Sequence, residues 1–105
     1  MTGHTLVIPR AHVAHYWALS EHQSEMLAAA CLLVGKGIQE ALEPSGMNLI
    51  TSRGAAAEQT VPHVHLHILP RWETDAVGPI WPPKHPPTSV SLVRAARLVR
   101  AALAS

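Results

Sequence analysis

Three histidines alternate with apolar residues in the segment His63-Val64-His65-Leu66-His67. Because alternate residues of a β-strand share a face, the three imidazoles would line one face while the apolar side chains point into the core. Near neutral pH, a neutral imidazole can attack phosphorus and a protonated imidazole can donate a proton to a leaving group. The spacing therefore favours nucleophilic and acid–base catalysis by histidine.

The same row of histidines has two other interpretations. Strands at a protein surface carry polar residues at alternate positions, so the row could be a solvated face. Alternate histidines can also bind zinc, but three in a line along about 13 Å of strand cannot all reach one ion without a bulge. No cluster of carboxylates or cysteines accompanies them, so we expect no metal and keep a zinc site as an alternative.

Small residues and neutral hydrogen-bond donors precede the histidines. Gly54 and the alanines at 55–57 would let backbone amides approach a ligand closely, and Gln59 and Thr60 add side-chain donors. Such donors suit a phosphate group. The formal net charge is only +1 and 14% of the residues are charged, which fits a small anionic ligand better than a nucleic acid.

The segment Gln-Thr-Val-Pro-His-Val-His-Leu-His-Ile-Leu-Pro-Arg at 59–71 resembles the signature of the histidine triad family. The resemblance extends back through residues 54–56, 48–50 and His12 to Gly-His-Thr-Leu-Val-Ile-Pro at 3–9. It implies hydrolysis or transfer at the α-phosphate of nucleotide conjugates, such as dinucleoside polyphosphates and nucleoside phosphoramidates. That chemistry proceeds through a covalent nucleotidyl-histidine and needs no metal or other cofactor.

The resemblance also implies a role for each histidine. His65 would be the nucleophile, His63 would help to fix its tautomer, and His67 would contact the phosphate or the leaving group. His4 would be a further neighbour that handles protons.

Three more residues would contact the substrate phosphate. Gln59 and Thr60 match family positions that donate hydrogen bonds to it. Ser52 stands where many relatives carry an asparagine that contacts the nucleotide, so that contact is expected to be weakened or remade by Ser52 itself.

The sequence departs from the family at its start. Relatives usually carry a further segment before the one that matches Gly3 and His4, and it supplies strands, a helix, the ribose-binding acid and much of the base pocket. We therefore expect an N-terminally short member of the family. A nucleotide-binding or interaction module with little turnover is the alternative to an active nucleotide hydrolase or transferase.

Local patterns predict the elements that position these residues. Strands are expected at 5–8, 47–51 and 61–69, where β-branched and apolar residues stand between turn residues. The last two are expected to be antiparallel neighbours. Proline-rich residues 70–87 are expected to be irregular, and residues 89–104 form an amphipathic helix with three arginines on one side.

A long helix is predicted after residue 20. Ser20 and Gln23 have the spacing of a capping box, and an apolar stripe follows at Leu27, Cys31, Val34, Ile38 and Leu42. Glycines at 35 and 37 lower helix propensity, which favours close packing on the sheet there. The fold class is therefore α+β, an antiparallel sheet packed with a long helix, in a domain at 1–87 followed by a C-terminal helix at 88–105.

Composition bounds the location of the protein. Its single cysteine cannot form an internal disulfide, which suits a reducing compartment. No run approaches the roughly 20 apolar residues of a membrane span, and no signal peptide is recognisable. We expect a cytoplasmic protein with a small nucleotide as its ligand and no membrane partner.

A homodimer is the expected assembly. Relatives of the smaller kind pair through the long helix and the strand at 47–51, which would place Leu27, Cys31 and Val34 near a two-fold axis. The alternative is a monomer whose helix at 89–104 folds back over the same surface.

Overall fold

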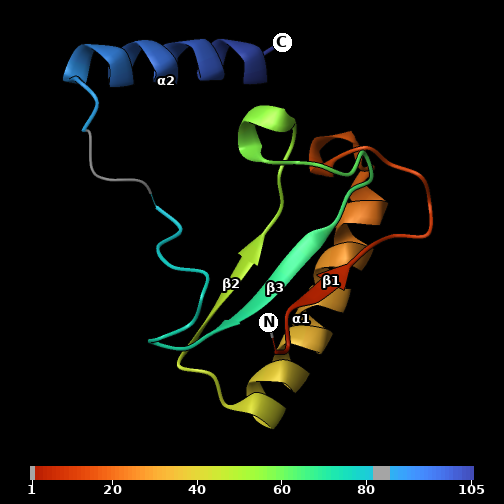
Figure 1. Ribbon diagram of the computed structural model, residues 1–105. Coiled ribbons are helices and arrows are strands. Elements are labelled where there is room, and N and C mark those ends of the chain that lie inside the picture. The colour runs from red at the N-terminus through yellow and green to blue at the C-terminus, as the bar shows by residue number, and fades with distance from the viewer. Residues whose placement is uncertain (1, 82–85) are drawn as a thin grey trace.

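A computed structural model describes residues 2–81 and 86–105. Three strands, β1 (Thr5–Val7), β2 (Gly46–Ile50) and β3 (Leu66–Arg71), form an antiparallel sheet in the order β1-β3-β2 within these residues. The long helix α1 (Glu21–Leu42) covers one face of this sheet, and α2 (Ser89–Leu103) ends the chain (Figure 1). Short 3-10 helices η1 (Tyr16–Ala18) and η2 (Ala55–Ala57) lie in the loops. The α+β prediction is confirmed.

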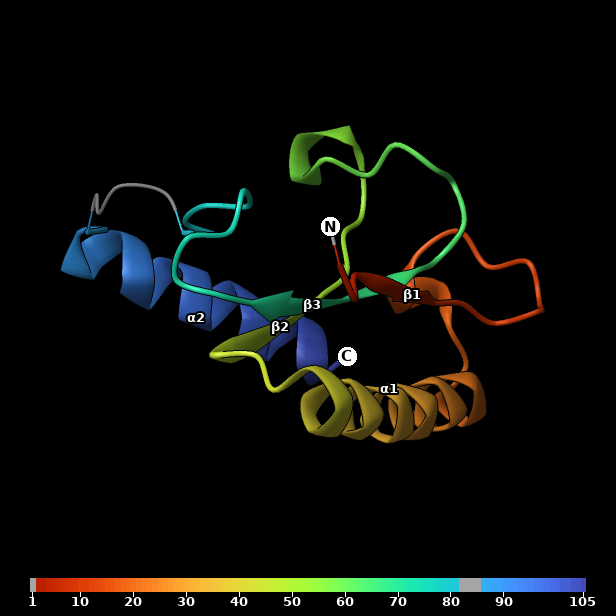
Figure 2. The ribbon, with the colours of Figure 1, turned by 60° about the horizontal axis from the view of Figure 1, so that its bottom comes forward.

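The core lies between α1 and the central strand. Val64, Leu66 and Ile68 are almost fully buried and pack against Leu27 and Cys31 of α1. The intervening histidines are only partly buried, so the segment alternates between the two faces as predicted. Viewed nearly along the sheet, α1 lies on one side and η2 on the other (Figure 2).

The start of α1 confirms the predicted capping box. The backbone N–H of Gln23 donates to Ser20 Oγ at 3.1 Å, and Gln23 Oε1 accepts from the Ser20 N–H at 2.9 Å. The expected close packing at the helix glycines is wrong. A Cβ on Gly35 would make only an ordinary contact with Met47, and one on Gly37 would meet nothing within 4 Å.

The predicted strand at 61–69 is displaced. β3 begins at Leu66, so His63 and His65 precede it and only His67 lies within it. Pro62 has no N–H to donate to a ladder. The N–H of His63 turns back to the Val61 carbonyl (2.9 Å), and that of Val64 donates to Val13 (2.7 Å). The other strands and both helices begin and end within one residue of the predicted bounds.

The structure of a single copy bears on two expectations about assembly surfaces. Leu27 and Cys31 are buried against the chain's own sheet and Val34 packs beside them, and their place near a two-fold axis stays a prediction. The C-terminal helix does not fold back, because α2 lies apart from α1 and the sheet (Figure 1) and has no buried residue. No helix in the described ranges is long and apolar enough to cross a membrane.

The segment after β3 is irregular but tied down. Arg71 donates to both carboxylate oxygens of Asp75, to Asn48 Oδ1 and to the Gly78 carbonyl. This arginine holds the pKa of Asp75 down at about 2, assisted by the Trp72 and Val77 amides. The expectation of irregular structure at 70–87 is wrong for Pro70 and Arg71, which pair with Met47 and Gly46 as the end of β3. It holds for 72–81 and 86–87, while residues 82–85 lie outside the described part. The division into units 1–87 and 88–105 stays a prediction.

Candidate active site

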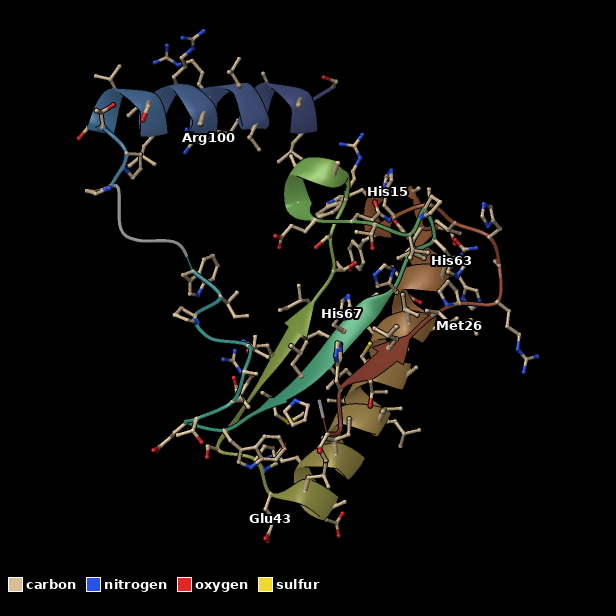
Figure 3. The ribbon with its side chains drawn as sticks, viewed as in Figure 1. His15, Met26, Glu43, His63, His67 and Arg100 are labelled. Atoms are coloured by element: carbon tan, nitrogen blue, oxygen red, sulfur yellow. The ribbon has the colours of Figure 1, made fainter. Side chains whose placement is uncertain are left out.

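The sheet face opposite α1 brings together histidines from both ends of the domain. Leu6 lies opposite His67 in the β1–β3 register, which carries His4 to the same face. The Nε2 atom of His4 lies 2.8 Å from Nδ1 of His67, with ring centroids 5.1 Å apart. The rings of His65 and His67 pack edge to face, with their centroids 4.8 Å apart. His4, His65 and His67 therefore form one contiguous cluster, and Figure 3 labels His67, its central member.

The tautomer of neutral His65 is defined by its backbone surroundings. Its Nδ1 lies 2.8 Å from the His63 carbonyl oxygen. A carbonyl can only accept, so Nδ1 carries the proton, and the lone pair of the neutral ring lies on Nε2. The backbone carbonyl of His63, rather than its imidazole, makes this contact. The arrangement leaves Nε2 chemically able to act as a nucleophile.

The imidazole of His63 is directed elsewhere. Its Nε2–H donates to the Pro9 carbonyl at 3.2 Å, and its ring lies 5.7 Å from that of His12. His63 thereby ties the end of β1 to the bend before β3 (Figure 3). This bend carries the His63 carbonyl that orients His65. The side chain of His63 therefore helps to fix the position of the His65 ring without contacting it through a hydrogen bond.

Thr51 is a residue of the site that sequence reasoning missed. Its hydroxyl, just past the end of β2, donates to the His65 carbonyl at 3.0 Å. His65 lies before β3 and has no ladder partner, so this bond fixes its backbone. The expected antiparallel pairing of the two strands was a signal that Thr51 would approach the histidine segment, but not that its hydroxyl would point there.

The electrostatics of the cluster favour a neutral His67. Burial is the main cause that lowers the pKa of His67 below its ordinary value of 6.5, and the neighbouring His65 and His4 lower it further. A neutral His67 can accept a proton at one ring nitrogen and donate one at the other. Its bond to the exposed His4 connects the cluster to solvent.

The loop before the histidines is held by Gln59. Its Oε1 accepts from the Gly54 N–H at 3.0 Å, and its Nε2 donates to the carbonyls of Ala14 (2.8 Å) and Val61 (3.0 Å). Both amide hydrogens are therefore engaged with the backbone. Gln59 shapes the loop in this conformation, and its direct contact with a phosphate stays a prediction that requires an exchange of partners.

The other two predicted phosphate contacts keep unengaged hydroxyls. Thr60 is exposed and Ser52 is half-buried, and neither hydroxyl makes a hydrogen bond within the described ranges. Ser52 lines an open cavity of about 580 Å³, together with Thr51, Arg53 and Trp17. No hydrogen bond joins Ser52 or Thr60 to His63 or to the cluster of His4, His65 and His67. The approach of these two hydroxyls to a phosphate therefore stays a prediction.

The zinc alternative finds no support in the geometry. In residues 2–81 and 86–105, no group of three or more His, Cys, Asp or Glu side chains is arranged to hold a metal ion. His63 and His65 each direct a ring nitrogen at a backbone carbonyl instead.

The chain is similar to known proteins over most of its length. It is 36% identical over 81 residues to an adenosine 5′-monophosphoramidase of Schizosaccharomyces pombe, covering 76% of this chain and 58% of that protein. It is 38% identical over 78 residues to an adenylylsulfatase of Arabidopsis thaliana, covering 71% of this chain and 38% of that protein. The chain thus spans roughly half, or less, of the length of these relatives.

The fold has close counterparts among solved structures. A crystal structure of a HIT family protein from Bacillus anthracis superposes with a TM-score of 0.85 at 32% identity, covering 97% of this chain and 74% of that one. The sequence profile of the HIT domain matches residues 1–74, which include the whole histidine cluster. On these grounds, the chain belongs to the histidine triad (HIT) domain family.

Proposed function

We propose that this protein hydrolyses or transfers a nucleotidyl group at the α-phosphate of a nucleotide conjugate, with His65 as the nucleophile. The observation that carries the proposal is the bond from His65 Nδ1 to the His63 carbonyl, because it leaves the Nε2 lone pair for attack. Family membership supports nucleotide hydrolysis at a coarse level. The two relatives named as a phosphoramidase and an adenylylsulfatase support an adenylyl group as the unit transferred.

The first step forms a covalent intermediate. His65 Nε2 attacks the α-phosphorus, a P–N bond forms, and the bond from phosphorus to the leaving group breaks. The imidazole becomes cationic, which strengthens its Nδ1–H bond to the His63 carbonyl. In the second step, water or another acceptor attacks the same phosphorus and the P–N bond breaks, which releases the nucleoside monophosphate or a new conjugate. The electron pair of the broken bond returns to Nε2 and restores neutral His65, and the proton of the attacking group passes to His67.

His67 and His4 would carry out the proton transfers. The departing group needs a proton, and His67 lies beside His65 with His4 behind it, at 2.8 Å from His67. A proton given up by His67 can be replaced through His4, which is exposed to solvent. Thr60 and Ser52 would donate their hydroxyl hydrogens to the phosphate oxygens, where charge develops in the transition state.

The test is intact-protein mass spectrometry during turnover of adenosine 5′-phosphoramidate. We expect a transient gain of one adenylyl group, and its loss together with turnover in His65→Ala. His12→Ala is the matched control, since His12 lies beside His63 without contacting the cluster through a hydrogen bond. Full turnover by His65→Ala would overturn the proposal.

Binding without appreciable turnover is the second candidate. It is favoured by Gln59, whose amide hydrogens are committed to backbone carbonyls and so leave fewer donors for a developing charge. Calorimetry that detects adenosine monophosphate binding, with no adenylyl adduct and no turnover in the same preparation, would select this candidate.

A further inference from the structure

The residues just before η1 hold the loop that precedes the histidines. Three consecutive residues, at 13–15, accept hydrogen bonds from the segment 53–64, which contains that loop. The bonds run from the Val64 N–H to the Val13 carbonyl (2.7 Å), from Gln59 Nε2 to the Ala14 carbonyl (2.8 Å) and from Arg53 Nε to His15 Nε2 (3.3 Å). Residues 13–15 form the brace. It fastens the start of the loop, its end and the histidine segment to one short stretch of chain.

The loop itself is closed between Gly54 and Gln59. The Gly54 N–H donates to Gln59 Oε1 at 3.0 Å, and the Gly54 carbonyl accepts from the backbone N–H groups of Ala57 and Gln59, both at 3.1 Å. Gly54 has a φ of +85°, which glycine adopts without strain. The loop therefore moves largely as one unit. The two side-chain bonds to the brace, from Arg53 at one end and Gln59 at the other, fix its orientation.

The bond between Arg53 and His15 defines the state of the His15 ring. A guanidinium N–H can only donate, so His15 Nε2 holds a lone pair and the proton of the neutral ring lies on Nδ1. That Nδ1 atom is buried and has no hydrogen-bond partner among the described residues. A buried N–H without a partner costs free energy, and proteins rarely keep one without a reason. The hydrogen bonding of the ring to the described residues is thus confined to Nε2, where it accepts from Arg53.

This contact lies beside a proposed phosphate contact. Arg53 follows Ser52 directly in the chain, and both line the open cavity of about 580 Å³ that His15 also borders. Figure 3 shows His15 at the end of the molecule where His63 lies. Within the described ranges, no hydrogen bond joins the His15 ring to the cluster of the other histidines. An effect of His15 on the reaction must therefore pass through Arg53 and the loop.

The expected behaviour of Gln59 gives this second tie its importance. A direct contact of Gln59 with the phosphate requires an exchange of partners, in which its Nε2 leaves the Ala14 carbonyl. Of the two side-chain bonds to the brace, the one from Arg53 to His15 then remains. It keeps the loop in place while Gln59 changes partners.

We propose that His15 is a positioning residue that acts through Arg53. Its neutral ring holds Arg53, and thereby holds the loop at 54–60 in the orientation that presents Ser52 and Thr60 to the substrate phosphate. This inference rests on the proposed function, and His15 touches neither the substrate nor the reacting atoms.

Loss of the His15 ring should weaken substrate binding more than it lowers kcat. The negative phosphate accepts hydrogen bonds already in the ground state, so a displaced loop costs affinity first. The backbone of His65 is held separately, by the Thr51 hydroxyl, and keeps its place. Thr51 and His15 therefore position different partners of the reaction, the nucleophile and the phosphate.

The first experiment compares His15→Leu with His15→Gln by calorimetric titration with adenosine monophosphate. Leucine removes the acceptor for Arg53, and we expect the dissociation constant to rise about fivefold, the effect of losing one ordinary hydrogen bond. Glutamine supplies an oxygen acceptor, so it should restore most of the affinity. His22→Leu, which replaces an exposed histidine of α1, is the matched control and should bind like the unmodified chain.

A double-mutant cycle tests whether His15 acts through Arg53. Arg53→Met removes the donor and its charge, so it should weaken binding by itself. His15→Leu should have little further effect in the Arg53→Met background, because the contact is already lost. Additive effects of the two substitutions would overturn the proposal, and so would an unchanged dissociation constant in His15→Leu.

Amide hydrogen exchange examines the brace without ligand or turnover. In His15→Leu, the hydrogen-bonded amides of the loop at 54 and 57–59 should exchange several-fold faster, while those of β3 keep their rates. Equal exchange in His15→Leu and the unmodified chain would overturn this inference and leave the proposed function standing. If the unmodified chain neither binds adenosine monophosphate nor forms an adduct, the proposed function is wrong, and with it the role of His15 in binding, even where faster exchange confirms the tie.

Discussion

His4 Nε2 and His67 Nδ1 lie 2.8 Å apart, although 63 residues separate them in the chain. Two features of the fold produce this contact. β1 pairs with the central strand β3, and the turn before β1 contains Gly3, whose carbonyl accepts from the Thr5 hydroxyl at 3.0 Å. The outer end of the proposed proton path therefore depends on a single turn at the N-terminus.

Gly3→Ala should damage both stability and catalysis. Gly3 has a φ of +78°, and a Cβ there would lie 2.5 Å from Leu42 Cδ1 and 2.9 Å from Pro70 Cγ. The left-handed backbone alone costs an alanine about 1–2 kcal/mol, and the clash displaces His4. We expect the free energy of unfolding in urea to fall by at least that amount, with turnover reduced. Gly46→Ala, with open space at its Cβ, is the control and should change neither.

Thr51→Val should slow the reaction more than it weakens substrate binding. The substitution keeps the shape of the side chain and removes the hydroxyl that donates to the His65 carbonyl. We expect a loss of about 1 kcal/mol in stability and a lower kcat with KM nearly unchanged, since Thr51 acts on the position of His65. Steady-state kinetics of Thr51→Ser, which retains the donor, should recover most of kcat. Equal kcat values for all three proteins would show that Thr51 does not position His65.

The order of the helices and strands could be predicted from local patterns. So could the alternation of histidines and buried apolar residues at 63–67 between the two faces of the sheet. The capping box at Ser20 and the apolar periodicity of α1 are readable within a few residues. The start of β3 could not be predicted, because Val64 bonds to Val13, far away in the chain. The orientation of His65 likewise depends on the backbone conformation of His63, which no residue type specifies.

The role of Gln59 shows the same limit at the candidate site. Its position beside Thr60 suggested a donor to phosphate, whereas its amide reaches Ala14, 45 residues away. A polar side chain near a ligand site can either contact the ligand or hold the loop that does. Sequence spacing cannot distinguish these two roles, since the choice depends on which backbone carbonyls the fold brings within reach.

His67 should make stability depend on pH in the weakly acidic range. Its pKa in the folded protein lies below 6.5, chiefly because of burial and then because of His65 and His4. The unfolded chain therefore binds the proton more readily, so stability rises with pH as the pH approaches 6.5 from below. The His67 contribution is fully present above 6.5 and is lost as the pH falls through the lowered pKa. The free energy of unfolding, measured in urea between pH 5 and 7.5, should rise less steeply with pH in His67→Gln than in the unmodified chain. Equal pH dependence in the two proteins would contradict a lowered pKa for His67.

Glu58→Gly should strengthen binding of an anionic nucleotide. Glu58 follows η2 with a φ of 66° and lies between the small-residue loop and Gln59. Glycine adopts this backbone without strain and removes a negative charge beside the proposed phosphate site, so less repulsion opposes the ligand.

Glu43→Gly is the matched control for this prediction. Glu43 has a φ of 47° at the end of α1, so this substitution removes the same charge and relieves the same kind of strain away from the loop. Calorimetric titration with adenosine monophosphate should give a dissociation constant several-fold lower for Glu58→Gly than for Glu43→Gly. This difference should shrink in high salt, because screening weakens the repulsion. If both variants bind alike, the loop at 54–58 does not face the phosphate, and the anion-binding role assigned to it is wrong.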